Sequence, residues 1–288
     1  MNSTPGHISR RRMLQTSGIA LAGLGLVGVT DYTNPRHQFV NERENLMSNN
    51  TAKSKPTIVL IHGAFADGSS WNDVMSTLIG QGYPVVAPSN PLRSVKGDSD
   101  YTASILNSIE GPLVLVGHSY GGSIISNAAT GNRNVQALVY VAGYAPEAGE
   151  SAGDLSGRFP GGTLGPTLAP PIPLPDGTND LLIEQSKFRD QFCADVPEPQ
   201  AKRMAASQRP CVDLALSEGS GEPAWKAIPS WFVFGELDKN IPAAAHRFMA
   251  ERAGARETVE VKGASHALSV SYADTVADVI LRAARHAK

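Results

Sequence analysis

The chain of 288 residues is 41% hydrophobic and 18% charged, which provides enough apolar material for one large globular domain with a sizeable core. The net charge of −2 and a single tight basic cluster at positions 10–12 argue against a nucleic-acid partner. The sequence has no His/Cys cluster with metal-ligand spacing and no glycine-rich phosphate loop, so we expect neither a metal nor a cofactor.

The first 30 residues have the pattern of an export signal. The stretch SRRRMLQ at positions 9–15 resembles the twin-arginine motif, and the uncharged residues 16–30 supply the apolar region that follows it. That region is short and rich in glycine for a membrane span, and an amphipathic or buried helix of the domain is the alternative. We expect the twin-arginine machinery to carry the folded protein to the periplasm or the cell exterior, with the signal either cleaved or kept as an anchor.

Residues 31–55 are polar, contain Asn-Pro and Asn-Asn pairs, and are expected to form a linker. The folded domain is therefore expected to span residues 56–288. Its first buried strand is the apolar run Thr57–Ile61, which ends in His62-Gly63-Ala64. A helix with a helical apolar period from Trp71 should follow, capped by one of the preceding serines.

A second strand is expected over residues 83–87, followed by a helix that Asp98 or Ser99 begins and Gly111 ends. The next apolar run, at 113–116, breaks at the sequence GHSYG, and helical spacing resumes after it. Glycines on both sides of Ser119 allow a sharp turn from strand to helix, so the pattern predicts a nucleophile elbow. A plain Gly/Ser-rich turn is the alternative.

After the elbow, Val135–Val141 is again a continuous apolar strand. Strands that alternate with helices in this way predict an α/β fold with a doubly wound, mostly parallel sheet covered by helices on both faces. The rhythm stops from 146 to 228, where prolines are frequent and only two helices are indicated, around 181–188 and 201–208. We interpret this stretch as a cap insertion over the site, with a loose surface loop as the alternative.

The cap insertion carries two further features. Its apolar residues are expected to line an acyl or alcohol pocket; they are Phe159, Leu164, Leu168, Ile172, Leu174 and Trp225. Cys193 and Cys211 also lie in it, and they either form a disulfide after export or remain thiols.

The sheet resumes with a strand over residues 230–234, which ends in the loop Gly235-Glu236-Leu237-Asp238. Ligands bind at the carboxyl edge of open α/β sheets, so Asp238 is well placed for chemistry, with Glu236 and Glu147 as competitors. A last strand over 257–261 leads to His266. The remaining histidines lie before the domain, in the tail, in turns, or, for His246, on an expected surface helix.

Three of these side chains form a catalytic set. A serine hydroxyl becomes a nucleophile when a histidine takes its proton and a carboxylate orients that histidine, and the order Ser119, Asp238, His266 fits this chemistry. The tetrahedral intermediate needs N–H donors for its oxyanion, and the backbone N–H groups of Ala64 and Tyr120 are the candidates.

Taken together, the elbow, the HG loop, the Gly-x-x-Asp loop and the Gly-x-x-His loop resemble the α/β-hydrolase superfamily from residue 56 to the C-terminus. The sequences VLIHGA and GHSYGG are similar to the branch of plant methylesterases and hydroxynitrile lyases. In that branch the lyases carry a lysine after the catalytic histidine and a threonine after the first-loop histidine, where this chain has Ala267 and Gly63.

The resemblance implies a serine esterase that cleaves a small, apolar carboxylic ester through an acyl-enzyme. Three alternatives share the fold: a cofactor-free perhydrolase or haloperoxidase, a hydroxynitrile lyase, and a non-catalytic ligand-binding protein.

Overall fold

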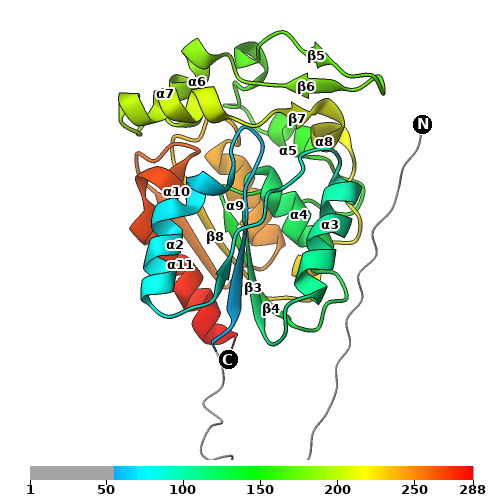
Figure 1. Ribbon diagram of the computed structural model, residues 1–288, viewed down its shortest axis with the longest axis vertical. Helices are drawn as coiled ribbons and strands as arrows, with labels where there is room; N and C mark the ends of the chain where they lie inside the picture. The colour runs from blue at the N-terminus through cyan, green and yellow to red at the C-terminus, as the bar shows by residue number, and fades with distance from the viewer. Residues whose placement is uncertain (1–54, 288) are drawn as a thin grey trace, which may run out of the picture. The chain divides into compact units, whose positions relative to one another are not determined.

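A six-stranded parallel sheet forms the centre of the protein. The computed structural model describes residues 55–287, so the expected export signal and linker lie outside the described residues. The strand order is β2-β1-β3-β4-β8-β9 (Figure 1). The strands are β1 Thr57–Ile61, β2 Val85–Val86, β3 Leu113–His118, β4 Val135–Val141, β8 Ser230–Gly235 and β9 Glu257–Val261. The predicted α/β fold with a mostly parallel, doubly wound sheet is confirmed.

Helices cover both faces of this sheet. One layer contains α2 and α11, and the other contains α3, α4 and α9 (Figure 1). The bounds of the core helices are α2 Asn72–Gly80, α3 Val95–Asn107, α4 Tyr120–Ala128, α9 Ala243–Arg252, α10 Leu268–Ser271 and α11 Ala273–His286, with the short 3-10 turn η1 at Gly68–Trp71. No helix within residues 55–287 is long and apolar enough to cross a membrane.

Strand β1 shows why the central runs are apolar throughout. Successive side chains of a strand point to opposite faces of the sheet. Ile58 and Leu60 accordingly pack in the cluster under α2 and α11, while Val59 and Ile61 pack in the cluster under α3 and α4. Because both faces are covered, both sets of side chains must be apolar.

Two helix starts differ from the sequence prediction. Helix α3 begins at Val95, and Ser94 caps it by accepting the Gly97 N–H at 3.0 Å, whereas Asp98 or Ser99 was expected to begin it. Asp98 is instead buried in the first turn, where its carboxylate binds other groups. The turn η1 is capped by Asp67 rather than by a serine.

The cap insertion is an ordered layer rather than a loose loop. Figure 1 shows β5, β6, α6 and α7 stacked across one end of the sheet. Its elements are α5 Ala152–Arg158, η2 Gly165–Thr167, β5 Ile172–Pro173, β6 Asn179–Leu181, α6 Gln185–Phe192, α7 Glu198–Ser207, β7 Cys211–Val212, α8 Asp213–Ser217 and η3 Ala224–Lys226. The strands β5, β6 and β7 form a small antiparallel sheet.

Several details of the cap differ from the sequence prediction. Leu181 belongs to β6, where it pairs with Cys211, so the helix expected over 181–188 begins only at Gln185. Ile172 is 49% exposed, and Trp225 is buried at the base of the cap with its indole N–H donating to the Pro146 carbonyl. Neither side chain lines the cavity between α7 and the η1 turn. Cys193 and Cys211 are both buried free thiols.

Candidate active site

Ser119 stands at the tight turn between β3 and α4. Its backbone has φ 52° and ψ −123°, a conformation that L-residues rarely adopt. The Ser119 carbonyl accepts the N–H groups of Gly122 at 2.9 Å and Tyr144 at 3.1 Å, which hold the turn. A Cβ on Gly117 would lie 2.5 Å from the Gly121 carbonyl oxygen, so the packing of strand against helix requires glycine there.

Asp238 and His266 come together at the carboxyl ends of β8 and β9. Asp238 Oδ2 accepts the Nδ1 proton of His266 at 2.7 Å, and both side chains are fully buried. Asp238 Oδ1 accepts the backbone N–H groups of Asn240 at 2.8 Å and Ile241 at 2.9 Å. Burial alone would raise the pKa of Asp238, but the adjacent His266 and a hydrogen bond from His246 hold it well below its ordinary value.

The bond to Asp238 fixes the proton of His266. An ionised carboxylate only accepts hydrogen bonds, so the proton resides on Nδ1 and the Nε2 lone pair is free. Among residues 55–287, His266 Nε2 is buried and has no hydrogen-bond partner. This nitrogen is therefore available to take a proton from a hydroxyl.

His118 links Ser119 to this pair. Its Nε2–H donates to the His266 carbonyl at 3.1 Å, and the two imidazole rings are 4.8 Å apart between centroids. Burial, together with the adjacent His266, lowers the pKa of His118 to about 3, so this side chain stays neutral. The residue directly before the elbow serine thus holds the backbone of the histidine loop.

The loop after β1 lies against the elbow. A Cβ on Gly63 would be 2.6 Å from Ser119 Cβ and 2.8 Å from the His118 carbonyl oxygen, so glycine permits this close approach. His62 anchors the loop, because its Nε2 accepts the Asn90 N–H at 2.9 Å while its carbonyl accepts the Asn90 amide at 3.0 Å. Ala64 follows directly and is buried.

Tyr120 provides the other candidate donor. It is the first residue of α4, where an N–H has no intrahelical acceptor. Its side chain points away from this N–H and donates its hydroxyl to Asp98 Oδ2 at 2.9 Å. Burial raises the pKa of Asp98, while the Tyr120 hydroxyl and the Arg93 N–H act in the opposite direction. Helix α3 therefore helps to fix the start of α4.

The competing acids have other partners. Glu147 forms an ion pair with Lys226 at 2.5 Å, and Glu236 accepts the Gly263 N–H at 2.9 Å. Asp238 alone among the three candidates bonds to His266. Within residues 55–287, no group of three or more His, Cys, Asp or Glu side chains is arranged to hold a metal ion.

The prediction that His246 lies on a surface helix is wrong. The side chain is fully buried, and its Nε2 lies 3.2 Å from Asp238 Oδ2. It lies on the inner face of α9 with Ala245, Met249 and Ala250. The helical spacing of these residues was the signal in the sequence, although the alanine run at 243–245 hides which face is buried.

The cap reaches both loops of the site from α6 and the turn after it. Gln191 donates its amide to the Lys239 carbonyl at 3.0 Å and to Asn240 Oδ1 at 2.7 Å, next to Asp238. The Phe192 carbonyl accepts the Ala267 N–H at 3.1 Å, and the Phe192 ring packs edge-on against His266. These contacts place the cap over the carboxyl edge of the sheet.

Asp195 supplies the second connection between the cap and the histidine loop. Its carboxylate accepts the Ser265 N–H at 3.0 Å, the Ser265 hydroxyl, and the Ser271 hydroxyl at 2.8 Å. One acidic side chain of the cap thus holds the residue before His266 and a residue in the following short helix.

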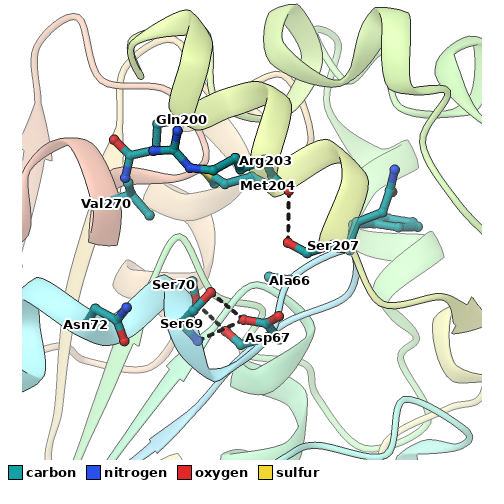
Figure 2. A pocket seen from close by; sticks show the side chains of 12 residues that line it. Ala66, Asp67, Ser69, Ser70, Asn72, Gln200, Arg203, Met204, Ser207 and Val270 are labelled. Carbon is teal, nitrogen blue, oxygen red and sulfur yellow. Dashed lines mark hydrogen bonds between the residues drawn. The ribbon is translucent and has the colours of Figure 1, made fainter.

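A cavity of about 250 Å³ lies between α7 and the η1 turn. Figure 2 shows Arg203 and Met204 on its upper wall, Asp67 on its lower wall and Val270 at its side. Phe65, the neighbour of Ala64, also lines it. The cavity therefore adjoins the first loop and the segment after His266, although no side chain of the candidate triad lines it.

A family model described as the alpha/beta hydrolase family matches residues 58–279. The chain belongs to this family. This membership agrees with the predicted resemblance.

Two curated relatives are similar to this chain. Salicylic acid-binding protein 2 from Nicotiana tabacum is 24% identical over 231 residues, which cover 72% of this chain and 89% of the relative. A carbendazim hydrolyzing esterase from Nocardioides sp. (strain SG-4G) is 30% identical over 106 residues, which cover 32% of this chain and 44% of the relative.

Two solved structures share the fold. Polyneuridine aldehyde esterase has a TM-score of 0.68 at 18% identity, with 80% of this chain and 99% of that chain covered. The pyrethroid hydrolase PytH has a TM-score of 0.65 at 24% identity, with 80% and 98% covered.

Proposed function

We propose that this protein is a serine esterase that hydrolyses a small, apolar carboxylic ester with Ser119, His266 and Asp238. The observation that carries the proposal is the buried bond of 2.7 Å between His266 Nδ1 and Asp238 Oδ2, which leaves Nε2 without a hydrogen-bond partner among the described residues. His118, the residue before Ser119, donates to the His266 carbonyl and so joins the strand-to-helix turn to the histidine loop. A serine on such a turn and a histidine held in this tautomer are the parts that acyl transfer requires.

The reaction would proceed in two halves. Ser119 Oγ attacks the acyl carbonyl while His266 Nε2 takes its proton, and Asp238 stabilises the resulting imidazolium. The Ala64 and Tyr120 N–H groups would then donate to the oxyanion. His266 returns the proton to the leaving alcohol, and water releases the acyl group from Ser119 by the same route.

The proposed substrate class rests on two observations. The relatives carry names of small-molecule esterases and hydrolases, which supports a small ester. In addition, apolar side chains contribute to the cavity beside the first loop, namely Phe65, Met204 and Val270. An apolar acyl or alcohol group would lose contact with water there.

The test replaces the nucleophile. We expect Ser119→Ala to lower kcat on a panel of aryl esters by about 10⁵-fold or more, because the triad acts as a unit. A fluorophosphonate should label the wild-type protein on the peptide that contains Ser119, and Ser104→Ala, an exposed serine of α3, serves as the control. Full turnover by Ser119→Ala, or saturable ester binding without turnover by the wild type, contradicts the proposal.

We also propose that the first 30 residues direct export by the twin-arginine route. The SRRRMLQ stretch and the uncharged region after it support this. Replacing Arg10 and Arg11 by lysine should leave the full-length protein in the cytoplasm of a bacterial host, as measured by fractionation. Unchanged export of this variant would contradict the proposal.

A further inference from the structure

A second buried histidine contacts the acid of the proposed triad. We propose that His246 is a positioning residue for ester hydrolysis: its Nε2–H donates to the same Asp238 oxygen that accepts the His266 proton, and so fixes the orientation and the charge of that carboxylate. This inference rests on the proposed function.

The geometry leaves Asp238 no freedom to rotate. Oδ2 lies 2.7 Å from His266 Nδ1 and 3.2 Å from His246 Nε2, while Oδ1 accepts the two backbone N–H groups of Asn240 and Ile241. Each oxygen thus accepts two hydrogen bonds, which is the usual capacity of a carboxylate oxygen. His246 supplies the one side-chain donor that does not take part in the proposed proton transfer.

The tautomer of His246 follows from its partner. The carboxylate only accepts, so Nε2 carries the proton and Nδ1 is bare. Among the described residues, His246 Nδ1 is buried without a hydrogen-bond partner. Burial, the largest influence, lowers the pKa of His246 even though Asp238 acts in the opposite direction. The side chain therefore donates as a neutral group.

The charged and titratable groups around the pair are few. His246 faces Asp238 and His266 from the two loops, with Glu260 of β9 more distant. The negative charge of Asp238 also acts to raise the pKa values of Tyr144, after β4, and of His118, at the end of β3. The other neighbour of the His246 ring is apolar, since the ring stacks on Phe234 with centroids 4.8 Å apart.

Packing alone does not account for a histidine at this position. The other buried residues of α9 are Ala245, Met249 and Ala250. An apolar side chain in place of His246 would itself bring no polar atom that needs a hydrogen-bond partner. Burying the bare Nδ1 without a partner costs stability. The hydrogen bond to Asp238 is the one polar contact that offsets this cost.

The donated proton also affects the base. It withdraws negative charge from Oδ2, so Asp238 stabilises the His266 imidazolium less than a carboxylate with a single donor would. Removing the donor should move the acidic limb of the pH–activity profile to higher pH. It should also allow the Asp238 carboxylate to reorient.

The test compares His246→Phe with His246→Gln. Phenylalanine keeps the ring but loses the donor, whereas the glutamine amide can donate to Asp238. We expect His246→Phe to lower kcat/KM on an aryl ester about 10-fold and to raise the acidic limb by about 0.5–1 pH unit, and His246→Gln to restore most of both. Phe248→Leu, on the same helix but without contact to Asp238, should alter only the melting temperature.

A proton NMR spectrum gives an independent readout. The low-field resonance of the His266 Nδ1 proton should shift in His246→Phe and return toward its wild-type position in His246→Gln. If both variants keep the wild-type rate, pH profile and resonance, or if both lose activity equally with an unmoved limb, the inference is overturned. If one of these outcomes is found while Ser119→Ala is inactive in the same assay, only the role of His246 is overturned and the proposed function stands. If Ser119→Ala retains turnover, the proposed function and this inference are both overturned.

Discussion

In the core, the side chains of the proposed triad stand directly after parallel strands, whereas in the cap the groups that reach them come from one helix and the turn after it. Ser119 follows β3, and Asp238 and His266 lie in the loops after β8 and β9. Gln191 and Asp195 of the cap reach those loops only through side-chain hydrogen bonds. The core thus positions the site by its backbone, whereas the cap adds side-chain contacts that one substitution can remove to the single backbone bond between the Phe192 carbonyl and the Ala267 N–H.

Replacing the core acid should have the largest effect. Asp238→Asn keeps the shape of the side chain but presents an amide where two histidine protons are accepted, so His266 is no longer held as the Nδ1–H tautomer. We expect kcat to fall about 10³–10⁴-fold with little change in KM.

The matched control for this change is Glu236→Gln, two residues earlier and exposed in the same loop. It should retain wild-type kcat. A large loss in Glu236→Gln together with a small one in Asp238→Asn would mean that the acid has been misassigned.

Removing the cap contact should have a smaller effect on the same reaction. Asp195→Asn leaves one oxygen to accept from Ser265 and Ser271, so the histidine loop loses part of its support. A shift of about 1 Å in a catalytic group can cost about 10²-fold, and we expect a loss of about 10–100-fold in kcat.

Asp190→Asn is the control, on the cap helix α6 that precedes the Asp195 turn, because its carboxylate is 83% exposed. It should leave kcat unchanged. If Asp195→Asn also reacts at the wild-type rate, the cap does not position the histidine loop, and the contrast between the two regions is smaller than the contacts indicate.

Glycine substitutions should have the smallest effect. They should also show the contrast between core and cap, here in the free energy of unfolding. Gly63→Ala places a Cβ within 2.6 Å of Ser119 Cβ, and we expect such overpacking to cost about 1–3 kcal/mol of the free energy of unfolding. Gly157, in the cap helix α5, has nothing within 4 Å of an added Cβ. There an alanine should stabilise the helix by about 0.5–1 kcal/mol. Chemical denaturation of both variants measures the difference, and equal destabilisation would contradict it.

The core was predictable because its signals are local. Each central strand is an unbroken apolar run between breakers, and the residues after the runs fall at one edge of a parallel sheet by topology alone. The placement of Asp238 beside His266 follows from that rule. Ser94 was missed as a helix cap because Asp98, which is also a good capping residue, lies four positions later and binds Tyr120 instead.

The cap was less predictable because its strands have two or three residues, too few to show alternation. Its key contacts also join distant parts of the chain: Asp195 and Ser265 are 70 positions apart. His246 belongs to the same class: helical spacing places it on one face with Met249 and Ala250, but the alanine run hides which face is buried, and nothing indicates the contact with Asp238. Tertiary contacts of this kind leave no periodic pattern in a sequence.

Strand β5 forms one edge of the small cap sheet and carries the exposed Ile172, a combination that usually invites another chain to pair there. The Leu174 N–H points inward, to the Thr178 carbonyl of the hairpin. Backbone N–H groups alternate in direction along a strand, so positions 171, 173 and 175 would direct theirs outward, and all three are prolines. The rim of the cap therefore offers an incoming strand no donors at these positions, which protects the protein from edge-to-edge aggregation at high concentration.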